Sequence, residues 1–448
     1  MTSKQRLQFV GCALFLVFLM WTWSGIHFST PPCEASNDQS ILNWKGCFKR
    51  TMLLKELPRR TVDLSQNGLV RLPYGFIGWT NDQIHTLYLS DNEFEELPDL
   101  STLKTLRMLS LRRNKLKRVN CDMLPDGIAH LILTDNHVDS FVGDCQSKFQ
   151  HLNKLMMARN HMEVFPADLV FPALELIRLP QNRLKQLPRN LLTTSPKLKW
   201  ASLAENPCCP EPELTLPDLG TLQCASQKEL GSGTSGVAVL CEDKSLVFKR
   251  FKSSSTDGSW QAELRISSLL PRNNPAILAP VGTAYLVSPL GSNEARSFGV
   301  VFSHKDALPI GLPPTFMSED RFPPNKQHRF TAERVLDAMN QVACALSQMH
   351  QSGVAHMDLY AHNTLLSEKD VVILDFGAAT CIKFLEKDDA ALFIALDVRA
   401  FGNLIGNLID HVVSDASTDV ASMKSLRKLK QLADKGIDST QLCKAATN

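Results

Sequence analysis

The C-terminal half of the sequence carries residues suited to holding phosphate groups. Gly231, Gly233 and Gly236 form a G-x-G-x-x-G segment, which lets the backbone approach phosphate oxygens. Lys249 then ends an apolar strand-like run, and Glu263 follows in a helical stretch. A strand lysine can bind phosphates while a helix glutamate orients it. Each feature alone is weak, because a glycine-rich segment can be a flexible linker and Lys and Glu are common surface residues.

A second group of polar residues follows a predicted helix that Gly353 can cap. The apolar residues of this helix recur at helical spacing: Val335, Met339, Val342, Leu346 and Met349. His356, Asp358 and Asn363 then form H-x-D-L-x-x-x-N, and Asp375 begins D-F-G after an apolar strand. The order, spacing and strand context of both groups match the protein-kinase signature.

The N-terminal half repeats one pattern. An Asn recurs with apolar residues at fixed positions around it, which is the L-x-x-L-x-L-x-x-N-x-L leucine-rich repeat. The seven positions are Asn67, Asn92, Asn114, Asn136, Asn160, Asn182 and Asn206. We expect one short parallel strand per repeat, an apolar spine, and buried Asn side chains that bond the turn backbone. The intervening strand positions should be exposed on a concave protein-binding face: Tyr88, Ser110, Ile132, Met156, Arg178 and Ser202.

Residues 225–410 resemble a protein kinase. The segments AHMDLYAHNTLL, ILDFGAA and DVRAFGNLIGNL are more similar still to the leucine-rich-repeat protein kinases best known from bacteria. The resemblance covers about residues 55–410 and implies ATP and Mg²⁺. It implies that Lys249 binds the phosphates, that Glu263 pairs with Lys249, and that the three glycines let the loop approach the nucleotide.

The same resemblance implies roles for the second group. Asp358 would accept or align the proton of the substrate hydroxyl, while Asn363 and Asp375 would hold Mg²⁺. Asp397, in DVRAFG, is similar to the Asp that starts a helix and anchors the catalytic loop.

Several residues depart from the family pattern. Met357 replaces the usual Arg after His356, and Tyr360 stands where Ser/Thr kinases usually have Lys. No Ala-Pro-Glu follows Asp375, and Thr380 is the only hydroxyl residue in the short segment 376–396. Room for one more helix, at about 420–434, follows that segment. The substrate-binding part of the lower lobe is therefore abbreviated.

These features predict a multi-domain protein, with an α/β leucine-rich-repeat solenoid followed by an α+β, bilobal kinase-like domain. We expect an ATP-dependent protein kinase, acting on Ser/Thr rather than Tyr, whose repeats bind a protein. One alternative is a catalytically weak pseudokinase scaffold, and another is a small-molecule kinase of the same fold. The net charge of +2 gives no indication of a nucleic-acid surface.

The expected boundaries follow the composition. The repeats occupy 54–210 after a flank at 31–53, a Pro- and acid-rich linker occupies 211–224, and the kinase-like domain occupies 225–448. Residues 1–30 form a signal peptide or signal anchor, with an apolar run at 9–28 that can just span a bilayer.

The side of the membrane on which the body lies stays open. The poor cleavage site favours an anchor, and positive charge before the run places later residues on the lumenal or extracellular side. The absence of any Asn-x-Ser/Thr sequon favours the cytoplasm. The cysteines also allow two interpretations: free buried thiols, or disulfides in caps that flank the repeats. The cap candidates are Cys33, Cys47, Cys208, Cys209 and Cys224.

Overall fold

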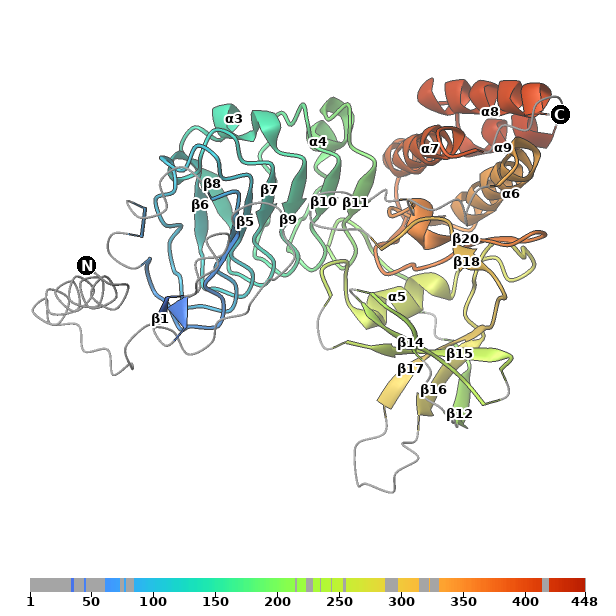
Figure 1. Cartoon of the computed structure of the whole chain (residues 1–448), viewed down its shortest axis with the longest axis horizontal. Helices are drawn as coiled ribbons and strands as arrows, with labels where there is room; N and C mark the ends of the chain where they lie inside the picture. The colour runs from blue at the N-terminus through green and yellow to red at the C-terminus, as the bar shows by residue number, and fades with distance from the viewer. Residues whose placement is uncertain are drawn as a thin grey trace, which may run out of the picture.

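The computed structural model places a repeat arm beside a C-terminal half (Figure 1). It describes residues 34–35, 44–45, 61–72, 76–77, 84–213, 216–222, 229–233, 235–242, 244–252, 255–286, 297–313, 322, 330–412 and 419–447. The predicted apolar run at 9–28 lies outside these residues. The chain is a multi-domain protein that combines parallel sheet, antiparallel sheet and helices.

The repeat arm is built on a seven-stranded parallel sheet with one strand per repeat, in the order β11-β10-β9-β7-β5-β4-β3. The strands are β3 (Thr61–Asp63), β4 (Thr86–Tyr88), β5 (Met108–Ser110), β7 (His130–Ile132), β9 (Lys154–Met156), β10 (Leu176–Arg178) and β11 (Trp200–Ser202). Equivalent repeat positions pair directly, as Leu109 does with Leu131. The repeat register read from the sequence is therefore the register of the sheet.

A ladder of Asn side chains ties the turns of neighbouring repeats together. Asn114 is typical: its Nδ2 donates to the carbonyls of Leu89 and Leu111 at 2.9 Å, and its Oδ1 accepts from the Phe94 N–H at 3.0 Å. The residue before each ladder Asn has positive φ, a conformation that most side chains disfavour. The ladder stabilises this tight turn by satisfying backbone groups that would otherwise be buried without partners.

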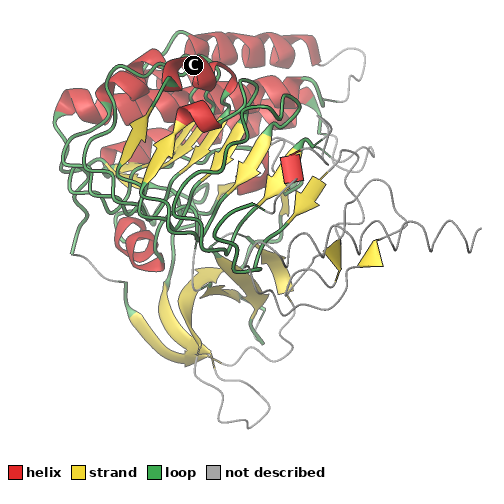
Figure 2. Cartoon of the chain, turned by 90° about the vertical axis from the view of Figure 1, so that its left-hand side faces the viewer, coloured by secondary structure: helices red, strands yellow, loops and turns green. Residues whose placement is uncertain are grey.

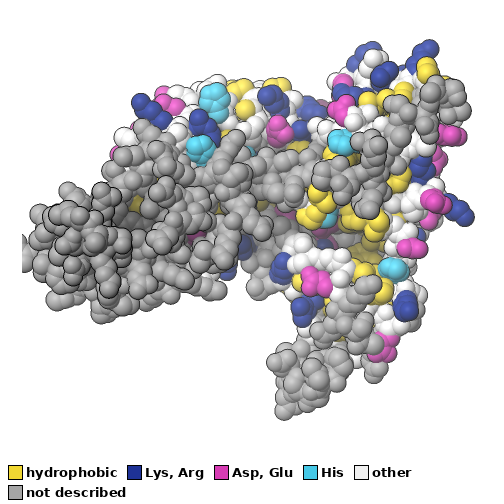
Figure 3. Space-filling model, in the orientation of Figure 1, with side chains coloured by type: hydrophobic (Ala, Val, Ile, Leu, Met, Phe, Trp, Pro, Cys, Tyr) yellow, Lys and Arg dark blue, Asp and Glu magenta, His cyan; other side chains and the backbone are white. Residues whose placement is uncertain are grey.

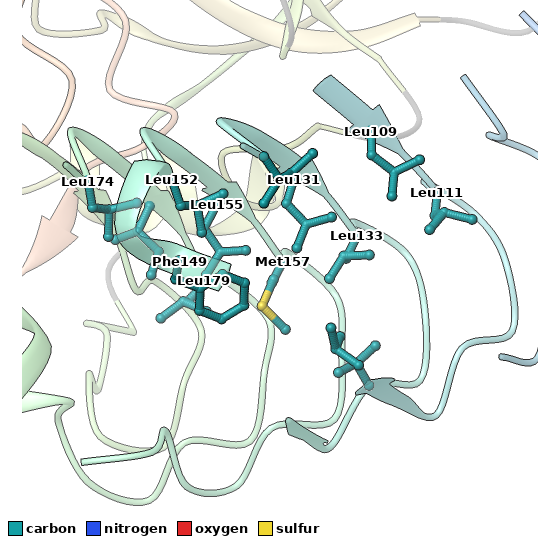
Figure 4. Packing of buried hydrophobic residues seen from close by; sticks show 14 of the residues in the cluster. Leu109, Leu111, Leu131, Leu133, Phe149, Leu152, Leu155, Met157, Leu174 and Leu179 are labelled. Atoms are coloured by element: carbon teal, nitrogen blue, oxygen red, sulfur yellow. The ribbon is translucent and has the colours of Figure 1, made fainter. Parts of the chain in front are cut away.

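Leucines and other apolar residues fill the interior behind the sheet, as the pattern predicted. Leu109, Leu131 and Leu155 hold equivalent positions in successive repeats and are fully buried (Figure 4). Shorter elements close the outer side: β6 (Arg118–Asn120), β8 (Ser140–Val142), η1 (Cys121–Met123), α3 (Cys145–Lys148), η2 (Phe149–His151) and α4 (Arg189–Thr194). β1 (Glu34–Ala35) and β2 (Trp44–Lys45) form a separate antiparallel pair.

The C-terminal half begins with a six-stranded sheet in the order β12-β16-β17-β15-β14-β13. Its strands are β12 (Asp218–Leu222), β13 (Glu229–Ser232), β14 (Gly236–Leu240), β15 (Leu246–Phe251), β16 (Gly282–Leu286) and β17 (Ser297–Ser303). β12 lies within the expected linker, yet it pairs in parallel with β16. Helix α5 (Trp260–Ser267) lies near this sheet (Figure 1).

Helices dominate the rest of the C-terminal half and gather at the end of the molecule away from that sheet (Figure 2). They are α6 (Ala332–Gln351), α7 (Lys387–Ile409), α8 (Asp419–Asp434) and α9 (Ser439–Thr447). Short strands beside them are β18 (Leu308–Pro309), β19 (Val354–Ala355), β20 (Thr364–Leu366), β21 (Val371–Ile373) and β22 (Thr380–Cys381), with η4 at Ala361–Asn363. Gly353, at φ +85°, ends α6 as predicted.

The predicted helix near 420–434 is α8, whereas α9 was not expected. A disulfide joins Cys443 of α9 to Cys344 of α6. A second disulfide joins Cys121 to Cys145 in successive repeats. The expected cap disulfides differ from these pairs: Cys208 and Cys209 are free, and Cys33, Cys47 and Cys224 lie outside the described residues.

Among the described residues, α7 is the one helix long and apolar enough to cross a membrane. Of its most apolar window, 56% is buried inside the protein, as in the core helix of a folded domain. On the face shown in Figure 3, positive and negative side chains are interspersed.

The concave face of the repeats is less exposed than the repeat pattern predicted. Ser110, Ile132, Arg178 and Ser202 are all buried, and only Tyr88 and Met156 keep intermediate exposure. The C-terminal half accounts for this at the last two strands, because Arg178 and Ser202 bond to residues beyond position 250. Periodicity identifies the face of a repeat sheet but does not show which surface covers it.

Candidate active site

Lys249 lies at the centre of a buried group of charges. Its Nζ donates to Glu263 Oε1 at 2.6 Å and to Asp375 Oδ1 at 3.2 Å. β15 carries the lysine, α5 carries the glutamate, and Asp375 follows β21. The structure therefore brings Asp375 to two residues that precede it by more than a hundred positions in the sequence.

The glycine segment forms a hairpin over this group. Gly233 N–H donates to the Gly236 carbonyl at 2.9 Å, which closes the turn between β13 and β14. A Cβ on Gly236 would lie 2.6 Å from the Arg250 carbonyl oxygen and 3.1 Å from Lys249 Cγ, so only glycine fits. A Cβ on Gly233 would lie 4.0 Å from Asp375 Oδ2, which places the turn above that carboxylate.

Asp358 lies beside Asn363 in the loop that follows β19. Asn363 Nδ2 donates to the Asp358 side chain at Oδ2 and to its backbone carbonyl, both at 2.9 Å. His356 is fully buried, accepts from the Asp358 N–H at 3.2 Å and contacts the Leu374 carbonyl at 3.2 Å. The loop is thus connected to the strand that presents Asp375.

Asp397 anchors the same loop from below. Its carboxylate accepts from the backbone N–H groups of His356 at 2.6 Å and Met357 at 2.8 Å. It also contacts His350 Nε2 at 2.9 Å. The sequence predicted this anchor at the start of a helix, but α7 begins at Lys387, so Asp397 lies inside the helix. The anchoring contact is formed from the middle of α7.

Arg178 of the repeat arm also reaches this site. Its Nη2 forms an ion pair with Asp358 Oδ1, its Nε donates to Asp257 Oδ1 at 2.9 Å, and its Nη1 donates to the Met357 carbonyl at 3.4 Å. The sequence placed Arg178 on the concave face without connecting it to Asp358. The signal available was that Arg178 is the one basic residue among the equivalent strand positions of the seven repeats.

The surroundings of Met357 account for the absence of the usual Arg at this position. Its side chain is fully buried and belongs to the apolar cluster that fills the repeat arm, together with Phe393 and Leu396 of α7. Its φ of 63° turns the backbone sharply between His356 and Asp358. An arginine at this position would bury a charge in an apolar environment, which is costly without a partner.

Burial and neighbouring charges shift the acid–base properties of the site. Burial alone would lower the pKa of Lys249, but Asp375 and Glu263 raise it above its usual value. Burial raises the pKa of Glu263. Burial would raise the pKa of Asp375 too, but the Lys249 ammonium holds it below the usual range. Lys249 and Asp375 are therefore charged at neutral pH.

Burial raises the pKa of Asp358 above its usual range, although the Arg178 guanidinium acts in the opposite direction. Burial also lowers the pKa of His356, so its imidazole is neutral. The donor set beside Asp358 fits Mg²⁺, because Asp375 keeps a 30% exposed carboxylate and Asn363 adds an amide oxygen. The glycine turn above Lys249 fits a polyphosphate.

Two protein families match the chain. The protein kinase domain family matches residues 224–391, and a leucine-rich-repeat family matches residues 56–167. The chain carries leucine-rich repeats followed by a protein kinase domain. The kinase match begins just before the glycine segment and contains every site residue predicted from the sequence except Asp397.

Two curated relatives are similar to part of the chain. Mouse Toll-like receptor 2 is 27% identical over 150 residues, which are 33% of this chain and 18% of that receptor. The U2 small nuclear ribonucleoprotein A′ of Debaryomyces hansenii is 36% identical over 75 residues, 16% of this chain and 31% of that protein. The chain thus covers less than a third of the length of either relative.

Proposed function

We propose that the kinase domain is catalytically active and transfers the γ-phosphate of ATP to Ser or Thr of a protein substrate. The observation that carries the proposal is the joining of Lys249, Glu263 and Asp375 in one buried group beside the Asp358–Asn363 pair. The kinase fold alone does not require these five polar side chains to contact one another, whereas phosphate transfer does.

Each residue has a part in the proposed transfer. Lys249 binds phosphate oxygens and Glu263 fixes the lysine's position. Asn363 and Asp375 hold Mg²⁺, which when bound neutralises charge on the phosphates. Gly231, Gly233 and Gly236 let the loop backbone approach the nucleotide, and Asp358 accepts or aligns the hydroxyl proton.

The test uses purified full-length chain with Mg²⁺ and labelled ATP, with and without a generic protein substrate. Transfer to protein supports the proposal. ATP binding without transfer would instead support the pseudokinase scaffold, which the abbreviated lower lobe favours. Consumption of ATP only when small-molecule acceptors are supplied would support a small-molecule kinase.

Control through the activation segment is not expected. Thr380 is fully buried in β22, whose backbone pairs with β19. A kinase acting on Thr380 would first have to unfold that pairing. We therefore predict that phosphatase-treated wild type keeps its rate. Thr380→Val, which preserves shape, should likewise keep a rate close to that of wild type in steady-state assays. A large loss of rate in both samples would contradict this prediction.

We propose residues 54–210 as a repeat solenoid, 211–224 as the connection and 225–448 as the kinase domain. The continuous Asn ladder and shared sheet register support the solenoid. Tyr88 and Met156 retain intermediate exposure on the concave face, and a protein ligand would bind around them. The net charge of +2 gives no indication of nucleic acid as a partner.

We further propose a single membrane anchor at 9–28, with the body on the lumenal or extracellular side. The disulfides Cys121–Cys145 and Cys344–Cys443 support this side, because disulfides persist in oxidising compartments. The protein should fractionate with membranes, and deletion of residues 1–30 should release it. In sealed vesicles the repeats should resist added protease. Digestion without detergent would place the body in the cytoplasm.

A further inference from the structure

The cation beside Asp358 is Arg178, which belongs to the repeat arm and not to the catalytic loop. Met357 and Tyr360 occupy the two loop positions where related kinases carry Arg and Lys. Arg178 of β10 instead forms the ion pair with Asp358 Oδ1. The two residues are 180 positions apart, so only the docking of the arm against the kinase domain joins them.

The contacts around Asp358 hold its carboxylate in place and leave room for a substrate hydroxyl. Asn363 Nδ2 holds Oδ2 and Arg178 Nη2 holds Oδ1, which fixes the plane of the carboxylate. A carboxylate has about four acceptor sites, so two remain for a substrate hydroxyl. The Arg178 side chain is only 3% exposed, whereas the Asp358 side chain is 16% exposed. The arginine is therefore enclosed by the protein, whereas part of the Asp358 carboxylate stays accessible.

Asp257 completes the arrangement of the guanidinium. It accepts from Arg178 Nε at 2.9 Å, and its backbone carbonyl accepts from Ser202 Oγ at 2.9 Å. Gly258 follows, and a Cβ there would lie 3.2 Å from the Gly377 carbonyl oxygen. The segment that carries Asp257 is thus held between the repeat strands and the D-F-G turn. An arginine with two fixed carboxylate partners keeps one orientation.

The interface around Arg178 has the composition of a protein core. Trp200 is 1% exposed, packs in the same apolar cluster as the kinase helices and donates through Nε1 to the Leu359 carbonyl at 2.9 Å. Leu176 and Ala204 belong to that cluster as well. Buried apolar contact of this kind is typical of permanent association rather than of a switch that opens.

The repeat arm also holds α5, which carries Glu263. Glu205 accepts from the Ser259 N–H at 3.0 Å and from the Ser259 hydroxyl at 2.7 Å, and Ser259 caps the start of α5. Glu211, the first residue of the connection after the repeats, accepts from Arg265 Nε at 2.8 Å. These contacts coexist with the closed Lys249–Glu263 pair. The arm is therefore docked on a kinase domain whose lysine, glutamate and aspartate are assembled.

We propose that Arg178 is a positioning residue for Asp358, so that the repeat arm completes the active site of the kinase domain. This inference rests on the proposed kinase activity. It assigns the last two repeats a part in the chemistry, beyond the binding of a protein ligand on the rest of the concave face.

The test compares the full-length wild type with Arg178→Met, Arg178→Lys, Arg178→Ala and the control Arg189→Met. Arg189 is also a repeat-arm arginine with an ion pair to the kinase domain, through Asp389 at 2.8 Å, but it is 61% exposed and its partner is not Asp358. Initial rates are measured while ATP and a protein substrate are varied separately. Thermal unfolding of each variant checks that the fold is retained.

We expect Arg178→Met to lower kcat by about 100-fold, the scale for a misplaced catalytic group, with KM for ATP unchanged. Arg178→Lys should recover part of kcat, and so should guanidinium ion added to Arg178→Ala below denaturing concentrations. Arg189→Met should match wild type. A merely structural loss would not be recovered by a small cation.

Other outcomes overturn the inference. An increase of kcat in Arg178→Met would show that the contact inhibits, and an unchanged kcat would show that it is irrelevant. An equal loss in Arg189→Met would point to general undocking. If wild type is inactive while Arg178→Met is active, the kinase proposal stands and the positioning role falls. If every form binds ATP without transferring phosphate, both fall.

Discussion

Replacing Asp358 with Asn is expected to lower phosphate transfer by about 10²- to 10⁴-fold, the range for loss of a general base. The change removes the charge that accepts or aligns the substrate proton but nearly preserves the shape of the side chain. Asn363 can still donate to the remaining oxygen, and Arg178 keeps Asp257 as a partner. Lys249 and Asp375 are untouched, so binding of Mg-ATP should be retained.

Single-turnover transfer and ATP binding by calorimetry, measured on the same preparation, check this expectation. Asp370→Asn is the matched control, because Asp370 is an exposed turn residue before β21. Wild-type turnover in Asp358→Asn would show that the catalytic assignment is wrong. Loss of ATP binding together with transfer would show that Asp358 belongs to the nucleotide site instead.

The parts of this site that motifs encode could be predicted from the sequence. The neighbours of each motif indicated its element: the glycine segment joins two strands, Lys249 lies within β15 and Glu263 lies within α5. The apolar strand Val371–Ile373, for example, places Asp375 at its carboxyl end. Their joint order allowed the contacts between them to be expected before any coordinates.

The contact between Arg178 and Asp358 could not be predicted in the same way. The repeat period identifies Arg178 as a residue that points out of the sheet, but exposure depends on which surface lies opposite. That depends on the path of the chain between the two regions, and no local pattern there specifies it. Met357 offered an indirect clue, since an apolar residue beside a catalytic Asp implies apolar surroundings.

Of the two disulfides among the described residues, one could be predicted from the sequence and the other could not. Cys121 and Cys145 lie in successive repeats, so the repeat period alone brings them close, with Cα atoms 4.9 Å apart. Cys344 and Cys443 are separated by 99 positions and meet because α9 packs on α6. α9 is a nine-residue helix, too short for a clear apolar period, so this pair had no basis in the sequence.

Replacing Lys249 with Met is expected to abolish transfer by a different route from Asp358→Asn. The ammonium is the cation shared by Glu263 and Asp375, at 2.6 and 3.2 Å. Its loss leaves the buried Glu263 carboxylate and the partly exposed Asp375 carboxylate without their shared cation, and it removes the charge that would contact the phosphates. We expect turnover to fall by about 100-fold or more, as when a preorganised charge contact is removed from an active site. Unlike in Asp358→Asn, affinity for ATP should fall as well.

Two comparisons make the Lys249 prediction specific. Glu263→Gln keeps the lysine and its contact with Asp375, so its loss of rate should be smaller and its ATP affinity nearer to wild type. Lys369→Met, at an exposed turn, should leave both quantities unchanged. Removing one partner of a buried pair also destabilises a protein, by about 3–5 kcal/mol, so thermal unfolding must accompany the kinetics.

Full activity in a folded Lys249→Met would mean that another lysine binds the phosphates. Lys252 is then the candidate, because its Nζ already contacts the glycine turn through Ser232 Oγ at 3.1 Å.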